Sequence, residues 1–301
     1  MTPETPYEMT RRVETRAGTM EIHVEGRADG PPVLLVHGAA VSASIWRPVV
    51  TRLRLAHRCF VPEMPLGSHR VPMRTELSPS VLSDALVDVL DALGLERVLV
   101  VGNDSGGAIS QVFTARHAER VAGLLLTNCD ALECFPPAEY AYMSAVPDYP
   151  RAAAVAARVL HRFPRLGMHG RAYGGLARSM RPAWIRAWCA PLARSAELRG
   201  DLASFLRNIG PEVTLEAARA LEHFPRPIKM VWGEDDPYFT IELARRLKDA
   251  LPAAALEAIP GGLTYVMLDA PERVAQAITD FAQDVGKAEA AEASRRAAAL
   301  S

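Results

Sequence analysis

Gly102-Asn103-Asp104-Ser105-Gly106-Gly107 is the stretch that decides the fold. It follows a buried apolar run at 98–101 and opens a segment of helical pattern over 106–117. A sharp turn from a strand into a helix forces its central residue into a strained backbone conformation, so small residues have to flank that centre. Glycines stand two positions before and two positions after Asp104. The stretch therefore predicts a strand–turn–helix elbow with Asp104 at its apex.

Two other interpretations of this stretch remain open. Ser105 could be the apex, although Asn103 would then occupy a position that requires a small residue. Asp104 could also be a plain helix cap, because aspartate is a favoured N-cap residue. If Asp104 is the apex, the unpaired N–H groups and the dipole of the following helix are expected to keep its carboxylate ionised. Such a carboxylate is ready to attack carbon or to accept a proton.

Outward from the elbow, short apolar runs alternate with segments of helical pattern. The runs stand at 33–36, 59–61, 98–101, 123–126, 228–232 and 255–259. Continuous apolar runs are typical of parallel strands that are covered on both faces. Apolar spacing predicts helices at 79–94, 106–117, 239–250 and 271–285. The alternation predicts a mostly parallel sheet with right-handed crossovers.

The alternation is interrupted between residues 134 and 223, where helical stretches are separated by proline and glycine. We therefore expect an α/β fold: a mostly parallel central sheet, flanked by helices, with an inserted helical cap. The core is expected over 11–133 and 224–286, beginning with an antiparallel strand pair, and the cap over 134–223. Residues 1–10 and 287–301 are expected to be flexible termini.

The composition narrows the classes of function. The chain has 301 residues, of which 49% are hydrophobic, and a formal net charge of −1. This balance predicts neither nucleic acid nor a membrane as a partner. The four cysteines form no CxxC pair and no metal-ligand spacing, so no metal site is expected. No apolar run reaches the ~18 residues of a membrane span and no signal sequence is evident, so we expect a cytoplasmic protein.

No cofactor is expected either. The glycine-rich elbow lacks the lysine of a phosphate-binding loop, and nothing in the chain implies a nicotinamide or a flavin. The partner that fits is a small-molecule substrate. A homodimer is one assembly with which the chain is compatible.

From residue 11 to residue 286, the chain resembles the α/β-hydrolase fold superfamily. His37-Gly38 looks like the oxyanion turn of that fold, which implies that the backbone N–H groups of Ala39 and Ser105 bind a developing negative charge. Trp232-Gly233-Glu234-Asp235-Asp236-Pro237 matches the segment that carries the acid, and Asp236 is the aligned member. Its neighbour Asp235 has a weaker claim. Asp130 and Glu133 stand at an alternative acid position that some dehalogenases use.

An apex aspartate resembles the aspartate-nucleophile branch of the superfamily, the epoxide hydrolases and the haloalkane and haloacetate dehalogenases. In that branch the carboxylate attacks carbon to form an ester, and a histidine activates the water that cleaves it. The stretch Leu268-Asp269-Ala270-Pro271-Glu272 aligns with the branch, but Thr264 then falls where the histidine is expected. No histidine follows His223. His69, on the loop after the strand at 59–61, is the candidate substitute; His161 and His169 of the cap are weaker ones.

Three functions follow from these residues. The first is a hydrolase of a small or medium organic molecule, epoxide hydrolase-like, that uses Asp104, Asp236 and an unusual base such as His69. The second is a lyase, cyclase or isomerase with Asp104 as general base, and the third is a ligand-binding protein without catalysis.

In the cap, Trp184 and Trp188 are four residues apart and either line an apolar pocket or belong to the core. Tyr173 is the expected cap contact to substrate. Tyr140, Tyr142 and Tyr149 are further candidates to protonate a departing oxygen.

Overall fold

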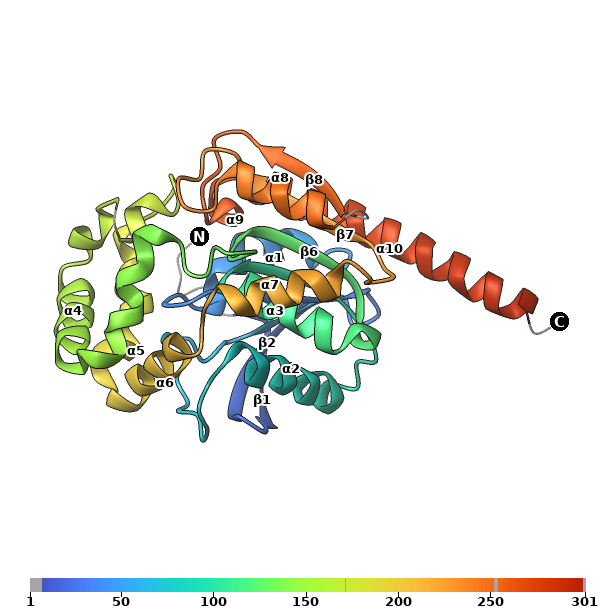
Figure 1. The fold of residues 1–301 in the computed structure, drawn as a ribbon. Helices are drawn as coiled ribbons and strands as arrows, with labels where there is room; N and C mark the ends of the chain where they lie inside the picture. The colour runs from blue at the N-terminus through green and yellow to red at the C-terminus, as the bar shows by residue number, and fades with distance from the viewer. Residues whose placement is uncertain (1–6, 171, 252–253, 300–301) are drawn as a thin grey trace.

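The computed structural model describes residues 7–170, 172–251 and 254–299. Within these residues, eight strands form one sheet in the order β1-β2-β4-β3-β5-β6-β7-β8. β2 pairs antiparallel with β1 and β4, and the remaining neighbours pair parallel. The strands are β1 (Met9–Thr15), β2 (Gly18–Gly26), β3 (Pro32–Val36), β4 (Arg58–Pro62), β5 (Val98–Asp104), β6 (Val121–Cys129), β7 (Ile228–Gly233) and β8 (Ala254–Ile259). The predicted fold class is confirmed (Figure 1).

Helices cover both faces of the sheet. α2, α3, α7 and α8 pack on one face, and α1 and α10 pack on the other. The helices that flank the sheet are α1 (Arg47–Leu53), α2 (Pro79–Leu93), α3 (Ser105–Arg116), α7 (Pro211–Leu221), α8 (Ile241–Ala250), α9 (Val266–Asp269) and α10 (Pro271–Ala299). Two short 3-10 turns, η1 (Ala43–Trp46) and η2 (Ala118–Arg120), lie between them.

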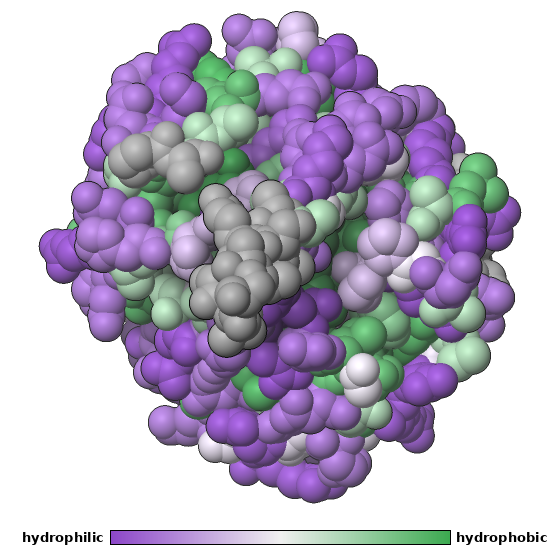
Figure 2. All heavy atoms as spheres, turned by 90° about the vertical axis from the view of Figure 1, so that its right-hand side faces the viewer, coloured by the Kyte–Doolittle hydropathy of each residue, from purple (hydrophilic) through white to green (hydrophobic). Residues whose placement is uncertain are grey.

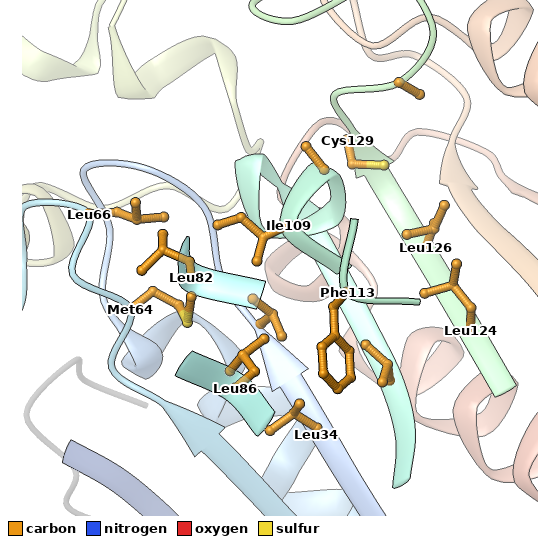
Figure 3. Packing of buried hydrophobic residues seen from close by; sticks show 14 of the residues in the cluster. Leu34, Met64, Leu66, Leu82, Leu86, Ile109, Phe113, Leu124, Leu126 and Cys129 are labelled. Atoms are coloured by element: carbon orange, nitrogen blue, oxygen red, sulfur yellow. The ribbon is translucent and has the colours of Figure 1, made fainter. Parts of the chain in front are cut away.

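The central strands are apolar throughout because both faces of each strand are buried. Successive residues of β3, Leu34 and Leu35, belong to the clusters on opposite faces of the sheet. On the first face, Leu34 lies beside Leu86 of α2 and Phe113 of α3 (Figure 3). Burying one such side chain contributes about 1.5–3 kcal/mol, so a polar residue on either face would be costly.

The inserted segment, residues 134–223, is helical in all its regular elements. These are η3 (Ala138–Asp148), α4 (Pro150–Arg162), η4 (Pro164–Met168), η5 (Tyr173–Gly175), α5 (Pro182–Arg194), α6 (Ala196–Arg207) and α7. α4, α5 and α6 lie together at one end of the molecule, at the left of Figure 1. α7 instead packs against α3, and the Thr214 hydroxyl of α7 donates a hydrogen bond to Leu132 O at 2.6 Å. The last helix of the inserted segment therefore covers the sheet.

Both ends of the chain carry more regular structure than the sequence predicts. The Tyr7 hydroxyl donates to Ala43 O at 2.7 Å, and β1 already begins at Met9. At the other end, the helix predicted over 271–285 continues to Ala299. The prediction of flexible termini also concerns residues 1–6 and 300–301, which lie outside the described residues.

The face of the molecule at the α10 end is dominated by hydrophilic residues, with hydrophobic ones between them (Figure 2). In the described part of the chain, no helix has both the length and the apolar character that crossing a membrane requires.

Gly107 allows α3 to pack closely on β6, because a Cβ atom at this position would collide with the Cβ of Cys129. Gly107→Ala is therefore expected to lower the free energy of unfolding by about 1–3 kcal/mol, because the well-packed interior has no room for the methyl group. Urea unfolding followed by tryptophan fluorescence measures the change. Gly286→Ala in α10, where a Cβ would meet nothing within 4 Å, is the control and is expected to gain about 0.5–1 kcal/mol. A Gly107→Ala protein as stable as the wild type would contradict this packing.

Candidate active site

The elbow between β5 and α3 presents Asp104. Its backbone dihedrals are φ 54° and ψ −136°, a strained conformation for a residue other than glycine. A Cβ at Gly102 would lie 2.5 Å from Ser110 Oγ, and a Cβ at Gly106 would collide with the backbone of His37. The Asp104 side chain makes no capping hydrogen bond to α3. The apex of the turn is thus Asp104 rather than Ser105, and its side chain is free of a capping role.

The turn after β3 lies directly against the Asp104 carboxylate. A Cβ at Gly38 would collide with Asp104 Oδ2, so only glycine allows this approach. His37 supports the turn, since its ring nitrogens lie 2.9 Å from Gly38 O and 2.9 Å from the N–H of Met64. With both nitrogens engaged and its side chain fully buried, His37 is not placed for proton transfer.

Asp104 faces a cavity of about 820 Å³ between the sheet and the inserted segment. Ala39 and Ser105 line it beside Asp104, and Asp130 lines it from the end of β6. The walls are mostly apolar and come from η3, α4, α5 and α6; they include Pro136, Met143, Val146, Leu160, Leu192, Leu202 and Leu206. A volume of this size, with few polar groups, is typical of a pocket for a small organic ligand.

Two carboxyl groups, the partly buried Asp104 and the buried Asp130, line the floor of this cavity, and a third, Asp236, is buried close enough to act on Asp104 through its charge. Burial raises the pKa of Asp104 to about 7, and the charge of Asp236 adds to the rise, while hydrogen bonds from Ser105 oppose it. Burial also raises the pKa of Asp236 to about 6, against hydrogen bonds from the N–H of Tyr238 and from Asn128. Burial and then the charge of Asp104 raise the pKa of Asp130 well above its usual range.

These shifts favour the protonated form of Asp130 and leave Asp104 only partly ionised at neutral pH. The sequence predicts that the helix N-terminus keeps Asp104 ionised. Its ionised form is less favoured than that prediction has it, since the cost of removing the carboxylate from water outweighs the hydrogen bonds that Ser105 offers. Among the described residues, no group of His, Cys, Asp and Glu is arranged to hold a metal ion.

One asparagine holds Asp236, and a second holds its neighbour Thr264. Asn128 Nδ2 donates to Asp236 Oδ2 at 2.8 Å, and Asn103 Nδ2 donates to Thr264 O at 2.8 Å. Thr264 thus lies next to Asp236, where the family pattern has its histidine. Its hydroxyl is buried without a hydrogen bond of normal geometry, although it is near enough to lower the pKa of Asp236.

The structure does not bring His69 to the cavity. His69 Nε2 lies 2.9 Å from Asp201 Oδ2 in α6, and Nδ1 accepts the N–H of Gly67 at 3.2 Å. His69 therefore ties the loop after β4 to the inserted segment, and the prediction of a catalytic base at this position has to be corrected. No described residue that lines the cavity is a histidine. His161 Nδ1 instead donates a hydrogen bond to Arg186 O at 3.0 Å.

Trp184 and Trp188 are also absent from the cavity lining. Their ring centroids are 5.4 Å apart, and the Trp188 indole donates to Ser44 Oγ at 3.1 Å. They belong to the core beneath the inserted segment, so their prediction as substrate contacts is corrected in favour of the packing interpretation. Tyr173 does line the cavity, but its hydroxyl donates to Ala40 O at 2.7 Å.

The remaining candidate acids are engaged at the surface. Asp235 pairs with Arg178 at 2.6 Å, and Glu133 pairs with Arg246 at 2.7 Å.

Of the other tyrosines proposed from the sequence, some line the cavity and one is exposed at the surface. Tyr140 and Tyr142 line the cavity, with the Tyr140 hydroxyl donating to Ala172 O at 3.0 Å, whereas Tyr149 is 64% exposed and does not line it.

Tyr265 is a site residue that sequence reasoning missed. It lines the cavity, is 1% exposed, and packs edge-on against Trp188 with centroids 6.1 Å apart. Within the described residues its hydroxyl has no hydrogen-bond partner. Burial and the nearby charge of Asp104 raise its pKa, so the hydroxyl remains a donor. Its only signal in the sequence is its place next to Thr264.

The comparisons with known proteins agree with this geometry. A family model described as the alpha/beta hydrolase family matches residues 33–277. Haloalkane dehalogenase 2 of Mycobacterium tuberculosis is 27% identical over 270 residues, which cover 86% of this chain and 90% of that protein. Cis-3-alkyl-4-alkyloxetan-2-one decarboxylase of Xanthomonas campestris is 26% identical over 289 residues, covering 90% and 95%. The haloalkane dehalogenase DbeA from Bradyrhizobium elkani shares the fold with a TM-score of 0.75, at 20% identity and 93% and 99% coverage.

The raised pKa of Asp104 makes a prediction about stability. Its pKa is about 7 in the folded protein against 3.8 for a free side chain, so the folded state binds this proton more tightly than the unfolded state. The resulting stability is complete below about pH 4 and is lost as the pH rises through about 7. Asparagine does not ionise, so Asp104→Asn does not lose this stability as the pH rises. The variant is therefore expected to gain up to about 4 kcal/mol over the wild type between pH 4 and pH 8.

Urea unfolding at several pH values measures this difference. The same substitution at Asp249, an exposed residue of α8, controls for the change in charge. A difference between Asp104→Asn and the wild type that stays constant from pH 4 to pH 8 would contradict the buried, proton-binding carboxyl.

Proposed function

The chain belongs to the alpha/beta hydrolase family, and from that membership we propose a hydrolase of small, largely apolar organic molecules with Asp104 as its nucleophile. The observation that carries the proposal is the Asp104 carboxylate at the elbow apex, open to an apolar cavity of about 820 Å³. Burial and the charge of Asp104 raise the pKa of Asp130, beside it, well above its usual range. Two carboxyl groups whose pKa values are pushed apart by their surroundings can divide the roles of nucleophile and acid.

In the first step, the ionised Asp104 attacks an electrophilic carbon of the substrate. A carbon–oxygen ester bond forms, and the bond from that carbon to the leaving oxygen breaks. Asp130 donates its proton to the departing oxygen and becomes a carboxylate. Tyr265, whose hydroxyl has no partner within the described residues, is a second donor to the same oxygen.

In the second step, Asp130 acts as the base that the missing histidine would have been. It takes a proton from water, and the hydroxide adds to the ester carbonyl of Asp104. The N–H groups of Ala39 and Ser105, both at the cavity wall, stabilise the oxyanion. When the intermediate collapses, the Asp104 carboxyl passes its proton to the departing alkoxide. Asp104 is ionised again and Asp130 is again protonated, so the cycle balances.

We further propose that 11–133 and 224–286 act as the core and 134–223 as the cap that selects substrate. Support comes from the cavity walls, which η3, α4, α5 and α6 supply, while the core supplies Asp104 and Asp130. Asp236, held by Asn128, would act on Asp104 through its charge, because it does not line the cavity.

A second function is supported by one observation, the lack of a histidine among the described residues that line the cavity. A carboxyl with a pKa of about 7 is well matched to accept a proton at neutral pH. Asp104 would then be the general base of a lyase, cyclase or isomerase, and no ester would need cleavage. The similarity to a decarboxylase of alkyl oxetanones agrees with that alternative.

A trapping experiment tests the assignment of the two carboxyl groups. Incubation with 1,2-epoxyhexane, 1-bromohexane or an alkyl β-lactone, followed by intact-mass spectrometry, should show an ester on Asp104. Asp130→Asn removes the base for the second step, so turnover should fall by about 10²–10⁴-fold. Tyr265 remains as the donor for the first step, so the ester should still form and accumulate. Asp104→Asn should form no adduct. An adduct retained in Asp104→Asn, or turnover unaffected by Asp130→Asn, would overturn the assignment.

The pKa values also predict the pH profile of kcat. Activity should rise as Asp104 ionises, with a midpoint near pH 7, because only the carboxylate attacks carbon. It should fall at higher pH, where Asp130 loses the proton that it donates. Steady-state rates from pH 5 to pH 10 measure both limbs. A profile with no ascending limb between pH 5 and pH 8 would exclude Asp104 ionisation from the reaction.

A further inference from the structure

The mouth of the cavity lies between α4 and α6. The lining residues that are exposed to solvent identify it: Tyr142, Pro150, Arg151, Val155, Ala156, Arg158, Ala196, Gly200 and Arg207. The lining residues at the other end, Asp104, Asp130 and Tyr265, are largely or fully buried. The cavity thus runs from an open mouth on the inserted segment to an acidic floor at the elbow.

Three arginines stand at this mouth without an opposite charge. Arg151 and Arg158 are two helical turns apart on α4, and Arg207 ends α6. None of the three forms an ion pair or a side-chain hydrogen bond with any residue that the structure describes. Arg199, which also lines the cavity, donates to Leu192 O at 2.5 Å.

The stretch of sequence that carries Arg151 and Arg158 is rich in arginine. Between Asp148 and Glu197 the sequence contains nine arginines and no aspartate or glutamate. This local excess stands against a net charge of −1 for the whole chain. An anion near the mouth is therefore attracted by several guanidinium groups, and no carboxylate of that stretch competes with it.

The interior of the cavity repels the same anion. Its walls are mostly apolar, and its floor carries Asp104 and Asp130. A charged head group would lose its hydration along the walls and meet like charge at the floor. An apolar chain gains from the same walls. The two ends of the cavity therefore suit the two ends of an amphiphile.

We propose that the cavity binds amphiphiles that have an oxyanion head, a carboxylate or a phosphate, held at the mouth by Arg151, Arg158 and Arg207. The apolar chain extends inward and brings its distal carbons to Asp104. The guanidinium group matches both oxyanions, because its planar donors can bind two oxygens at once. That the distal part of the chain carries the reactive carbon rests on the proposed function; the binding itself does not.

Isothermal titration calorimetry with decanoate, decyl phosphate and the neutral 1-decanol tests the head group. The charged ligands should bind more tightly than decanol. Substituting Arg151, Arg158 or Arg207 singly by glutamine should weaken decanoate binding about two- to fivefold, and the triple variant about 10- to 100-fold. Binding of decanol should change less than twofold. Whichever of decanoate and decyl phosphate binds more tightly identifies the preferred oxyanion.

A matched triple variant controls for total charge. Arg162, Arg165 and Arg194 lie on the same inserted segment, and none lines the cavity. Replacing these three by glutamine removes the same charge and should leave decanoate affinity within about threefold of the wild type. Equal losses in the two triple variants would overturn a defined head-group site, as would equal affinity for decanoate and decanol.

Ligands with alkyl chains of different length test whether the apolar part of the ligand lies in the cavity. From hexanoate to decanoate, each added methylene should tighten binding about fourfold, because each buries about the same apolar area. Affinity that does not depend on chain length would place the ligand outside the cavity. Asp104→Asn should bind decanoate at least as tightly as the wild type, since the floor loses negative charge. If this variant binds decanoate while no ester forms on wild-type Asp104, the proposed hydrolase is contradicted and the proposed binding site is not.

Discussion

The partial burial of the Asp104 carboxylate, with no cation beside it among the described residues, is the constraint on which the chemistry of this site depends. The elbow forces the side chain out of the turn, and the oxyanion turn at Gly38 closes around it. The mostly apolar walls of the cavity above offer it few polar partners. The groups that offset the lost hydration are hydrogen-bond donors, the strongest of them at Ser105. The carboxyl therefore titrates near neutral pH, which suits both nucleophilic attack and proton transfer.

A second consequence of this burial concerns the proton balance of the site. The charge of Asp236 raises the pKa of Asp104, and the charge of Asp104 raises the pKa of Asp130, so ionisation of all three near neutral pH is disfavoured. A site with a histidine would obtain its base from that ring. Here Thr264 lies next to Asp236 in its place, and a threonine hydroxyl cannot accept a proton at this pH. In the proposed reaction, the carboxyl group of Asp130 therefore supplies the proton transfer that a histidine would have provided.

Much of this arrangement could be predicted from local patterns in the sequence. The spacing of glycines around Asp104 identified the elbow, and the apolar runs identified the parallel strands. What could not be predicted depends on contacts between distant residues. His69 is engaged by Asp201, 132 residues away, and Trp188 by Ser44, 144 residues away. Helical spacing placed Trp184 and Trp188 on one face but could not tell whether that face meets the core or the cavity, and nothing local marked Tyr265.

The most direct test of the central claim is a single turnover in oxygen-18 water, followed by digestion and mass analysis of the peptide that contains Asp104. With enzyme in excess over 1,2-epoxyhexane, the account predicts that one oxygen-18 atom enters the Asp104 carboxyl, because hydroxide adds to the ester carbonyl of that side chain. Label in the product alone would mean that water attacks the substrate directly. Conversion without label in either would mean that Asp104 moves protons and forms no ester.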